Sequence, residues 1–204
     1  MARAMSAPSI LRAAISAGII PDSAEVSRKG VAQWDDGVLA WVAWLSKDKT
    51  GRLLWHTNTG DAKFGDAMEE YGRLSVPIRG IGDPSLEWPV AFTEDVAAWL
   101  RDGLGESLTF VEDRADLCRL LQEKGDVARG GLYAWLPIAN YPARLVQSLI
   151  LARDLGSAEL EQRALERLAG EPVELSHGRV LDIQSSAGRW AKEYAKALGI
   201  PVQL

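Results

Sequence analysis

Residues 37–46 read GVLAWVAWLS and residues 52–57 read RLLWHT, and these two runs decide the fold. Each run is short, apolar and aromatic, and the segment 47–51 between them (KDKTG) is rich in turn-forming residues. Two such runs around a Gly-containing loop predict a β-hairpin. A helix over the first run is the alternative, because a short apolar run is compatible with either periodicity.

Tryptophan is concentrated around this hairpin. Four of the eight tryptophans (Trp34, Trp41, Trp44 and Trp55) fall within 22 residues. Tryptophan is a large buried anchor, so the plain interpretation is a Trp-rich core. In a strand, however, Trp41 and Trp44 point to opposite faces, and a sheet covered on one side cannot bury both. At least one indole is therefore a candidate for the surface.

Outward from the hairpin, capping residues and apolar spacing define the other elements. Helices are expected over 8–17 and 61–72, after caps at Thr93 and Asp113, and over 143–155, 157–169 and about 186–198. Short strands are expected near 107–111 and 132–136, and the Pro- and Gly-rich segment 73–92 is expected to be irregular.

These elements predict an α+β fold. A small antiparallel sheet, made of the hairpin near 37–57 and the short strands near 107–111 and 132–136, would pack with helices, and the C-terminal part would be all-helical. The helices at 143–155 and 157–169 would form a packed antiparallel pair across a Gly-Ser turn. No linker or low-complexity tract interrupts the chain, so residues 1–204 are expected to form a single compact domain.

Composition excludes several classes of protein. The chain has 204 residues, of which 47% are hydrophobic and 25% charged, with 23 basic against 28 acidic residues and a net charge of −5. That hydrophobic content excludes a disordered tail, and the acidic balance argues against a nucleic-acid-binding protein, which needs a basic footprint. A single cysteine, Cys118, excludes an intrachain disulfide framework and a multi-cysteine zinc site. Its place among leucines on a helix indicates a buried structural thiol.

The sequence also suggests a compartment. The longest uncharged stretch, residues 130–143, is too short to cross a bilayer, so no membrane association is expected. No acid precedes Asp22, as in an organellar transit peptide, but Arg12 interrupts the only apolar run that could serve a secretory signal. We interpret residues 8–17 as the first helix of the domain and expect a cytoplasmic protein. Sixteen arginines against seven lysines, with 28 alanines, favour a GC-rich and therefore bacterial genome.

Motifs for catalysis are absent from the sequence. It has neither Gly-Lys of a phosphate-binding loop nor Gly-x-Ser-x-Gly of a nucleophile elbow, and its only histidines, His56 and His177, lie far apart. We therefore expect no bound metal and no cofactor. The alternative is a hydrolase-like enzyme with an unrecognised site around His56 or His177, with the hydroxyl of Thr57 or Ser176.

The leading hypothesis is a non-catalytic protein that binds a partner basic at the contact. Carboxylates steer such an encounter, and a desolvated Trp anchors it. The expected contact residues are Trp34, Asp35, Asp36, Trp44, Glu69 and Glu70. Bacterial toxin-neutralising immunity proteins are one class that is small, often acidic and free of motifs, and the analogy is with that class alone. A small-ligand or carbohydrate receptor that uses the Trp cluster is a further alternative.

Overall fold

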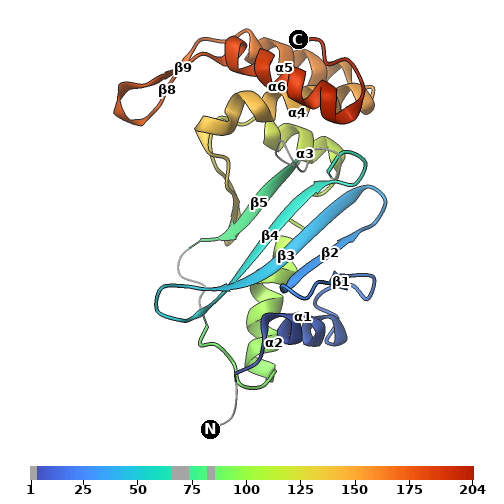
Figure 1. Cartoon of the computed structure of the whole chain (residues 1–204), viewed down its shortest axis with the longest axis vertical. Helices are drawn as coiled ribbons and strands as arrows, with labels where there is room; N and C mark the ends of the chain where they lie inside the picture. Colours follow the sequence, from blue (N-terminus) through green and yellow to red (C-terminus); the bar gives the residue numbers. More distant parts are fainter. Residues whose placement is uncertain (1–3, 66–73, 82–85) are drawn as a thin grey trace. The chain divides into compact units, whose positions relative to one another are not determined.

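The computed structural model of the chain describes residues 4–65, 74–81 and 86–204, and its sheet is built around the expected hairpin (Figure 1). Strands β3 (Leu39–Lys47) and β4 (Leu53–Asp61) are neighbours in the sheet. In the turn between them, the Asp48 N–H donates to the Arg52 carbonyl at 2.9 Å, and the Gly51 N–H donates to the Asp48 carbonyl at 3.0 Å. The hairpin prediction is confirmed, and the helical alternative is excluded.

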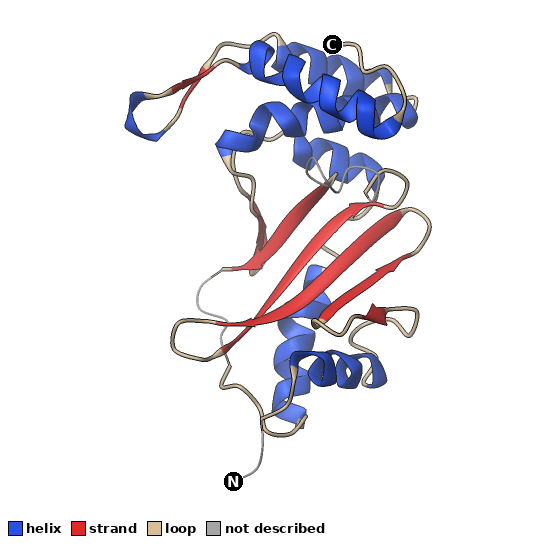
Figure 2. Cartoon of the chain, viewed as in Figure 1, coloured by secondary structure: helices blue, strands red, loops and turns tan. Residues whose placement is uncertain are grey.

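Seven strands of the described chain form one sheet in the order β1-β2-β3-β4-β5-β7-β6 (Figure 2). The remaining strands of that sheet are β1 (Glu25–Val26), β2 (Val31–Asp35), β5 (Ser75–Gly80), β6 (Val127–Arg129) and β7 (Leu132–Ala134). A separate small hairpin consists of β8 (Val173–Glu174) and β9 (Val180–Leu181). The strand expected near 132–136 is β7, and the fold class is α+β, as predicted.

Two of the helices begin at the side-chain caps that the sequence indicates, Thr93 and Asp113. The helices are α1 (Ala7–Ser16), α2 (Glu94–Leu100), α3 (Arg114–Leu121), α4 (Tyr141–Asp154), α5 (Ala158–Leu168) and α6 (Ile183–Leu198), with a π-helix η2 (Arg101–Gly105) and 3-10 turns η3 (Ile138–Asn140) and η4 (Ser176–Gly178). The side chains of Thr93, Asp113 and Ser157 accept the N–H of the third residue that follows each of them. The end of α4 and the start of α5 flank Gly156, so these two helices are separate, as expected. Among the described helices, none is both long enough and apolar enough to cross a membrane.

The strand expected at 107–111 is wrong. The chain leaves η2 in a series of turns, in which the N–H groups of Leu108, Thr109 and Phe110 donate to carbonyls three residues earlier. Phe110 and Val111 are buried in succession, without the alternation of a half-covered strand. These residues are apolar because the loop that contains them is buried. In a run this short, the sequence pattern of a buried loop cannot be distinguished from that of a buried strand.

The segment 73–92 also differs from its expected irregular form, because it contains β5. Val76 and Ile78 are buried, whereas Ser75, Pro77 and Arg79 are more exposed, so the strand periodicity is present despite the proline. The helix expected over 61–72 falls largely on residues 66–72, which lie outside the described residues. Its described beginning, residues 62–65, is a turn that follows β4.

The chain divides into two compact units, each assembled from three stretches. Unit 1 consists of Met1–Thr59, Pro77–Phe110 and Ala128–Tyr133, and unit 2 consists of Gly60–Val76, Val111–Val127 and Ala134–Leu204. Both draw on strands of the sheet. Whether they behave as the single domain expected from the sequence stays a prediction.

In unit 1, the sheet is covered by helices on one face. The segment η2 approaches β4 so closely that a Cβ on Gly103 would lie 2.2 Å from Trp55 Nε1. A side chain at position 103 would therefore clash with the indole, which explains a glycine inside a helical segment. The inward side chains of α2 and η2, including Val96, Leu100 and Leu104, are buried.

The core of unit 2 lies among α3, α4, α5 and α6, which pack against one another. Tyr194 on α6 is fully buried and accepts a hydrogen bond from Gln147 Nε2 at 2.8 Å. Cys118 on α3 is buried and donates to the Ser148 carbonyl at 3.3 Å. Burial raises the pKa of this thiol to about 11, so it stays protonated and unreactive at neutral pH.

Candidate functional site

The register of β2 on β3 decides which face of the sheet each tryptophan occupies. Trp34 lies opposite Trp41, whereas Trp44 lies opposite Val31. Because side chains alternate along a strand, Trp34 and Trp41 share one face and Trp44 lies on the other. The two central tryptophans of the hairpin therefore point to opposite faces, as the strand periodicity predicts.

Trp34 belongs to the covered face. Trp34 is only 9% exposed. Its ring stacks on the ring of Trp41, with the ring centroids 6.0 Å apart and the ring planes inclined by 13°. The Trp41 Nε1–H donates to the Leu108 carbonyl at 3.2 Å, which ties this face to the turns after η2. Trp34 thus lacks the exposed surface that a partner anchor needs. Of the two anchors expected from the sequence, Trp44 is the one that remains.

The face that carries Trp44 is open. Figure 2 shows no described helix of unit 1 over it, and its side chains are half-buried or exposed. We call the following residues the open face: Val31, Gln33 and Asp35 of β2, Ala40, Val42, Trp44 and Ser46 of β3, and Leu54, His56 and Asn58 of β4. One covered and one open face are common for an antiparallel sheet, but an open face usually carries polar side chains. Here Val42, Trp44 and Leu54 interrupt that pattern.

A stacked pair of rings, Trp44 and His56, lies within the open face. The ring centroids are 5.0 Å apart and the planes are inclined by 13°. His56 Nε2 is 2.7 Å from Ser46 Oγ, so the imidazole is fixed both by a hydrogen bond and by the indole. Burial, and then the positive charge of Arg79, lower the pKa of His56. The pair is therefore a neutral, rigid, largely flat surface at neutral pH.

The lowered pKa of His56 predicts a pH dependence of stability. The folded protein disfavours the imidazolium, whereas the unfolded chain binds the proton near its ordinary pKa of 6.5. The stabilisation is therefore complete above pH 6.5 and is lost as the pH falls below that value. Urea unfolding of the wild type and of His56→Gln, from neutral to acidic pH, measures this contribution. We expect the wild type to lose more unfolding free energy than the variant, and equal losses would contradict the prediction.

Two of the expected carboxylates lie in the turn between β2 and β3. Asp35 Oδ1 accepts the Gly37 N–H at 3.0 Å, and Asp36 Oδ1 accepts the N–H groups of Val38 and Leu39, each at 2.8 Å. Both residues are exposed, and Asp35 belongs to the open face by its register opposite Ala40. The turn thus presents two hydrated negative charges at the edge of the open face.

The other expected contact residues are not placed with them. Glu69 and Glu70 lie outside the described residues. The contact of Ser46 with His56 was not predicted from the sequence, although its signal is present there. The two residues lie on facing strands of one hairpin, at positions that share a face.

The residues of the enzyme alternative do not converge in the described structure. His56 is hydrogen-bonded to Ser46, and no carboxylate of the described residues contacts it. Thr57 is buried on the opposite face of β4. Ser176 begins the short turn η4 that also contains the backbone of His177. The described residues contain no group of three or more His, Cys, Asp or Glu side chains that could hold a metal ion.

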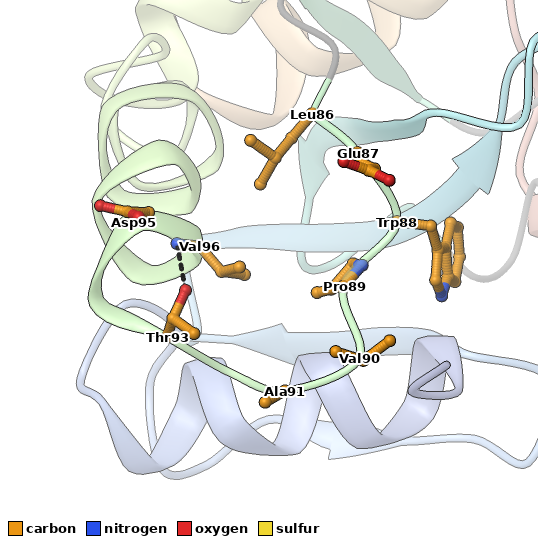
Figure 3. Close-up of a pocket in the computed structure, with 9 residues that line it drawn as sticks. All are labelled: Leu86, Glu87, Trp88, Pro89, Val90, Ala91, Thr93, Asp95 and Val96. Atoms are coloured by element: carbon orange, nitrogen blue, oxygen red, sulfur yellow. Dashed lines mark hydrogen bonds between the residues drawn. The ribbon is translucent and has the colours of Figure 1, made fainter. Parts of the chain in front are cut away.

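A separate pocket of unit 1 lies between the segment before α2 and α2 itself (Figure 3). Its volume is about 390 Å³. Leu86 and Val96 point into it, whereas Trp88 and Asp95 point away. The Trp88 Nε1–H donates to the Met5 carbonyl at 2.7 Å, and the Lys47 ammonium lies 4.6 Å from the Trp88 ring centroid. The lining is mixed, because Glu87, Thr93 and Asp95 accompany its apolar residues, and the Thr93 side chain is engaged in the cap of α2.

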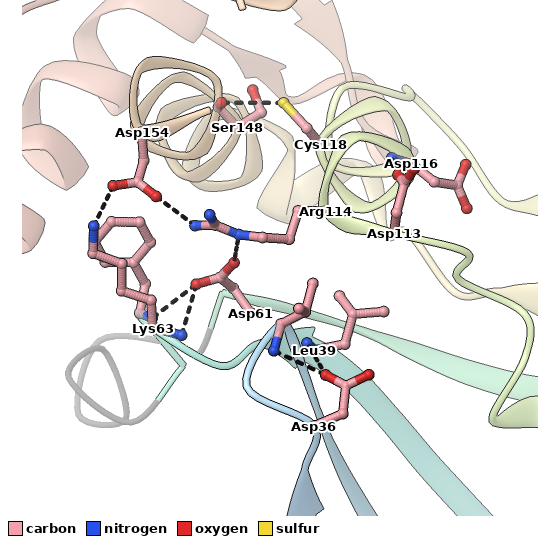
Figure 4. A network of polar contacts seen from close by, with 12 residues as sticks. Asp36, Leu39, Asp61, Lys63, Asp113, Arg114, Asp116, Cys118, Ser148 and Asp154 are labelled. Carbon is pink, nitrogen blue, oxygen red and sulfur yellow. Dashed lines mark hydrogen bonds and ion pairs between the residues drawn. The ribbon is translucent and has the colours of Figure 1, made fainter. Parts of the chain in front are cut away.

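An ion-pair network organises part of unit 2 (Figure 4). Arg114 bridges two carboxylates, with its Nε 2.6 Å from Asp61 Oδ2 and its Nη2 2.6 Å from Asp154 Oδ2. The Lys63 ammonium is a second partner of Asp154. Burial opposes ionisation of Asp154, but the hydrogen bonds from Lys63 and Arg114 outweigh it and lower the pKa. Every charge has an opposite partner, so this is a stabilising network rather than a reactive one.

Comparisons of the chain with protein-family models, with curated proteins and with solved structures find no match.

Proposed function

We propose that this protein acts by binding another protein through the open face, without catalysis. The observation that carries the proposal is the half-buried Trp44, stacked on His56 in a sheet face that no described helix of unit 1 covers. Tryptophan is enriched among the residues that dominate interface energies, because its burial in an interface removes a large apolar surface from water. An indole already held by a neighbouring ring loses little conformational freedom on binding.

The charges beside the open face favour a partner that is basic at the contact. Asp35 and Asp36 remain exposed while they cap their turn, and the chain as a whole carries a net charge of −5. Such carboxylates accelerate association with a positive surface and discriminate against acidic ones. A small acidic protein that occupies a basic surface has the profile of a bacterial toxin-neutralising immunity protein, and we propose that class, acting in the cytoplasm, as the biological setting.

The arrangement supports a carbohydrate receptor less well. A sugar-binding platform uses several exposed aromatic rings. Of the Trp cluster, Trp44 alone lies on the open face, while Trp34 and Trp41 stack on the covered one.

The hydrogen bond between Ser46 and His56 is the observation that favours a hydrolase as second candidate. A nucleophile and its base lie within hydrogen-bond reach there. A hydrolase also needs a third group that orients the imidazole and hydrogen-bond donors that stabilise an oxyanion. The contacts of the described residues supply neither. Incubation with a fluorophosphonate probe separates the two functions. We expect no adduct on Ser46, and an adduct that is absent from His56→Gln would favour the hydrolase.

The binding proposal is tested by photo-crosslinking followed by kinetics. A photoreactive amino acid at Val42 on the open face should capture a discrete protein in source cells, whereas the same group at the exposed Lys192 on α6 should not. With the captured partner purified, Trp44→Ala should weaken binding by at least about 2 kcal/mol, mainly through faster dissociation. Asp35→Asn with Asp36→Asn should slow association, and the effect should shrink as salt rises.

A matched control is Trp135→Ala, because Trp135 is also exposed but lies outside the open face. Equal losses for Trp44→Ala and Trp135→Ala would contradict the proposal, as would a partner that is acidic where it meets this chain.

A further inference from the structure

A buried tyrosine and a buried arginine in unit 2 have polar atoms without partners. Tyr141, the first residue of α4, is 0% exposed, and Arg144, one turn later, is 6% exposed. Arg144 donates through Nη1 to the Pro137 carbonyl and through Nη2 to the Glu123 carbonyl, both at 2.7 Å. Within the described chain, the Tyr141 hydroxyl and Arg144 Nε have no hydrogen-bond partner. Both of these groups can donate a hydrogen bond.

Charged side chains from α5 gather around the same tyrosine. Arg163 Nη2 lies 2.7 Å from Glu123 Oε1, and Arg167 Nη2 lies 3.5 Å from that same oxygen. Tyr141 interacts electrostatically with Arg144, Arg163, Arg167 and Glu123 together. We call these five residues the Tyr141 cluster.

The charges of the Tyr141 cluster do not balance. Three guanidinium groups face the Glu123 carboxylate, and Asp126, which interacts with Arg144, adds a second negative charge among the described residues that act on Tyr141 or Arg144. Arg163 and Arg167 share a single oxygen of Glu123, and the Arg167 contact is at the outer limit of a hydrogen bond. Each guanidinium offers five N–H donors, so the cluster has more donors than acceptors.

Unpartnered buried donors are costly, and each such group calls for a ligand or a water. A neutral water satisfies donors but leaves the excess positive charge. An oxyanion satisfies both, because its oxygens accept several hydrogen bonds and arginine binds it in a fixed geometry. Arg163 and Arg167 are each about a third exposed (38% and 27%), so the cluster is open to solvent on the α5 side.

We infer that the Tyr141 cluster is a binding site for a small oxyanion, with a phosphoryl group as its preferred form. The Tyr141 hydroxyl and the Arg167 guanidinium donate to its oxygens, and the buried Arg144 adds positive charge. The inference is independent of the open face, which belongs to unit 1.

Thermal unfolding and calorimetric titration with inorganic phosphate test this site. We expect the melting temperature to rise saturably with phosphate and to exceed the effect of chloride at equal ionic strength, because a ligand of the folded state stabilises by mass action. An arm with acetate at the same ionic strength separates a phosphoryl site from a carboxylate site. A larger response to phosphate supports the phosphoryl preference, and a larger response to acetate overturns it.

Two variants make the test specific. Tyr141→Phe keeps the ring and removes only a hydroxyl without a partner, so the variant should fold and melt no lower than the wild type. It should bind phosphate roughly tenfold more weakly, the size of one lost hydrogen bond to a charged group. Arg167→Gln should weaken phosphate binding at least as much, whereas Arg189→Gln on the exposed surface of α6 should leave it unchanged.

Three results would overturn the inference. The first is a wild type that responds to phosphate no more than to chloride. The second is a phosphate response that survives in full in both Tyr141→Phe and Arg167→Gln, and the third is an equal loss in Arg189→Gln. The first of these, with an unchanged or raised melting temperature for Tyr141→Phe, would mean that the cluster holds water only.

Discussion

Replacement of Asp61 by asparagine is expected to lower the free energy of unfolding by about 3 kcal/mol, because it breaks a buried ion pair from one side. Asp61 is 0% exposed, and its Oδ2 lies 2.6 Å from Arg114 Nε. Its Oδ1 accepts the N–H groups of Lys63 and Phe64 at 3.0 and 2.9 Å, which fixes the turn after β4 (Figure 4). Asparagine at this position has one oxygen acceptor and one NH2 donor. If its oxygen accepts the N–H groups of the turn, its NH2 group faces the guanidinium, and in the flipped orientation the hydrogen bonds of the turn are lost.

Asp36→Asn is the matched control for this prediction. Asp36 fixes its own turn through Oδ1 in the same way, accepting two backbone N–H groups, but it is exposed. The control should therefore cost no more than about 1 kcal/mol. Urea unfolding at neutral pH gives both values. Similar losses for the two variants would show that the turn, rather than the buried charge pair, is what Asp61 supplies.

The elements that the sequence predicts are those with a local signal. Thr93 and Asp113 mark helix starts because the side chain of a cap accepts a hydrogen bond from the backbone N–H only three residues later. Such a contact depends on neighbouring residues of the sequence alone. The parity of Trp41 and Trp44 is equally local, since alternation follows from strand geometry alone. Which of the two faces would be covered is not local. It depends on η2 and the turns after it, and η2 begins at Arg101, 40 residues beyond the end of the hairpin at Asp61.

The elements that it misses depend on tertiary context. β5 forms despite Pro77 because its neighbours in the sheet supply the pairing, and residues 107–111 turn because η2 continues α2. The polar groupings join residues remote in sequence: Asp61 with Arg114, and Glu123 with Arg163. A pair of that kind has no spacing to recognise. Arg144 carries a faint sequence signal, as a charge within the apolar residues of α4, but its carbonyl partners come from other turns.

Alanine at Trp34 and at Trp44 is expected to have opposite consequences, although both residues belong to the Trp cluster. Trp34→Ala should lower the free energy of unfolding by about 3–5 kcal/mol, the usual cost of emptying a large core site. Trp34 is buried, it stacks on Trp41, and it faces the helical side of the sheet. Trp44→Ala should cost only about 1 kcal/mol, because the half-buried indole loses chiefly its stacking on His56.

Binding should follow the reverse order once stability is taken into account. At a temperature where both variants are folded, Trp34→Ala should bind the crosslinked partner with nearly the wild-type affinity, since the open face is intact. Trp44→Ala should bind at least about 2 kcal/mol more weakly, because it removes the anchor itself. Measuring unfolding and partner affinity on the same preparations separates loss of fold from loss of contact.

This pair of variants distinguishes the binding surface from a second core. If Trp44→Ala unfolds as easily as Trp34→Ala, then the open face is covered in the functional protein, and the indole is structural. If both variants are stable and both bind normally, Trp44 is not the anchor. The expected combination is a stable Trp44→Ala that binds poorly, together with a destabilised Trp34→Ala that still binds. This combination is expected only if one face of the sheet packs on the core and the other binds the partner. The register of β2 on β3 puts Trp34 on the first face and Trp44 on the second.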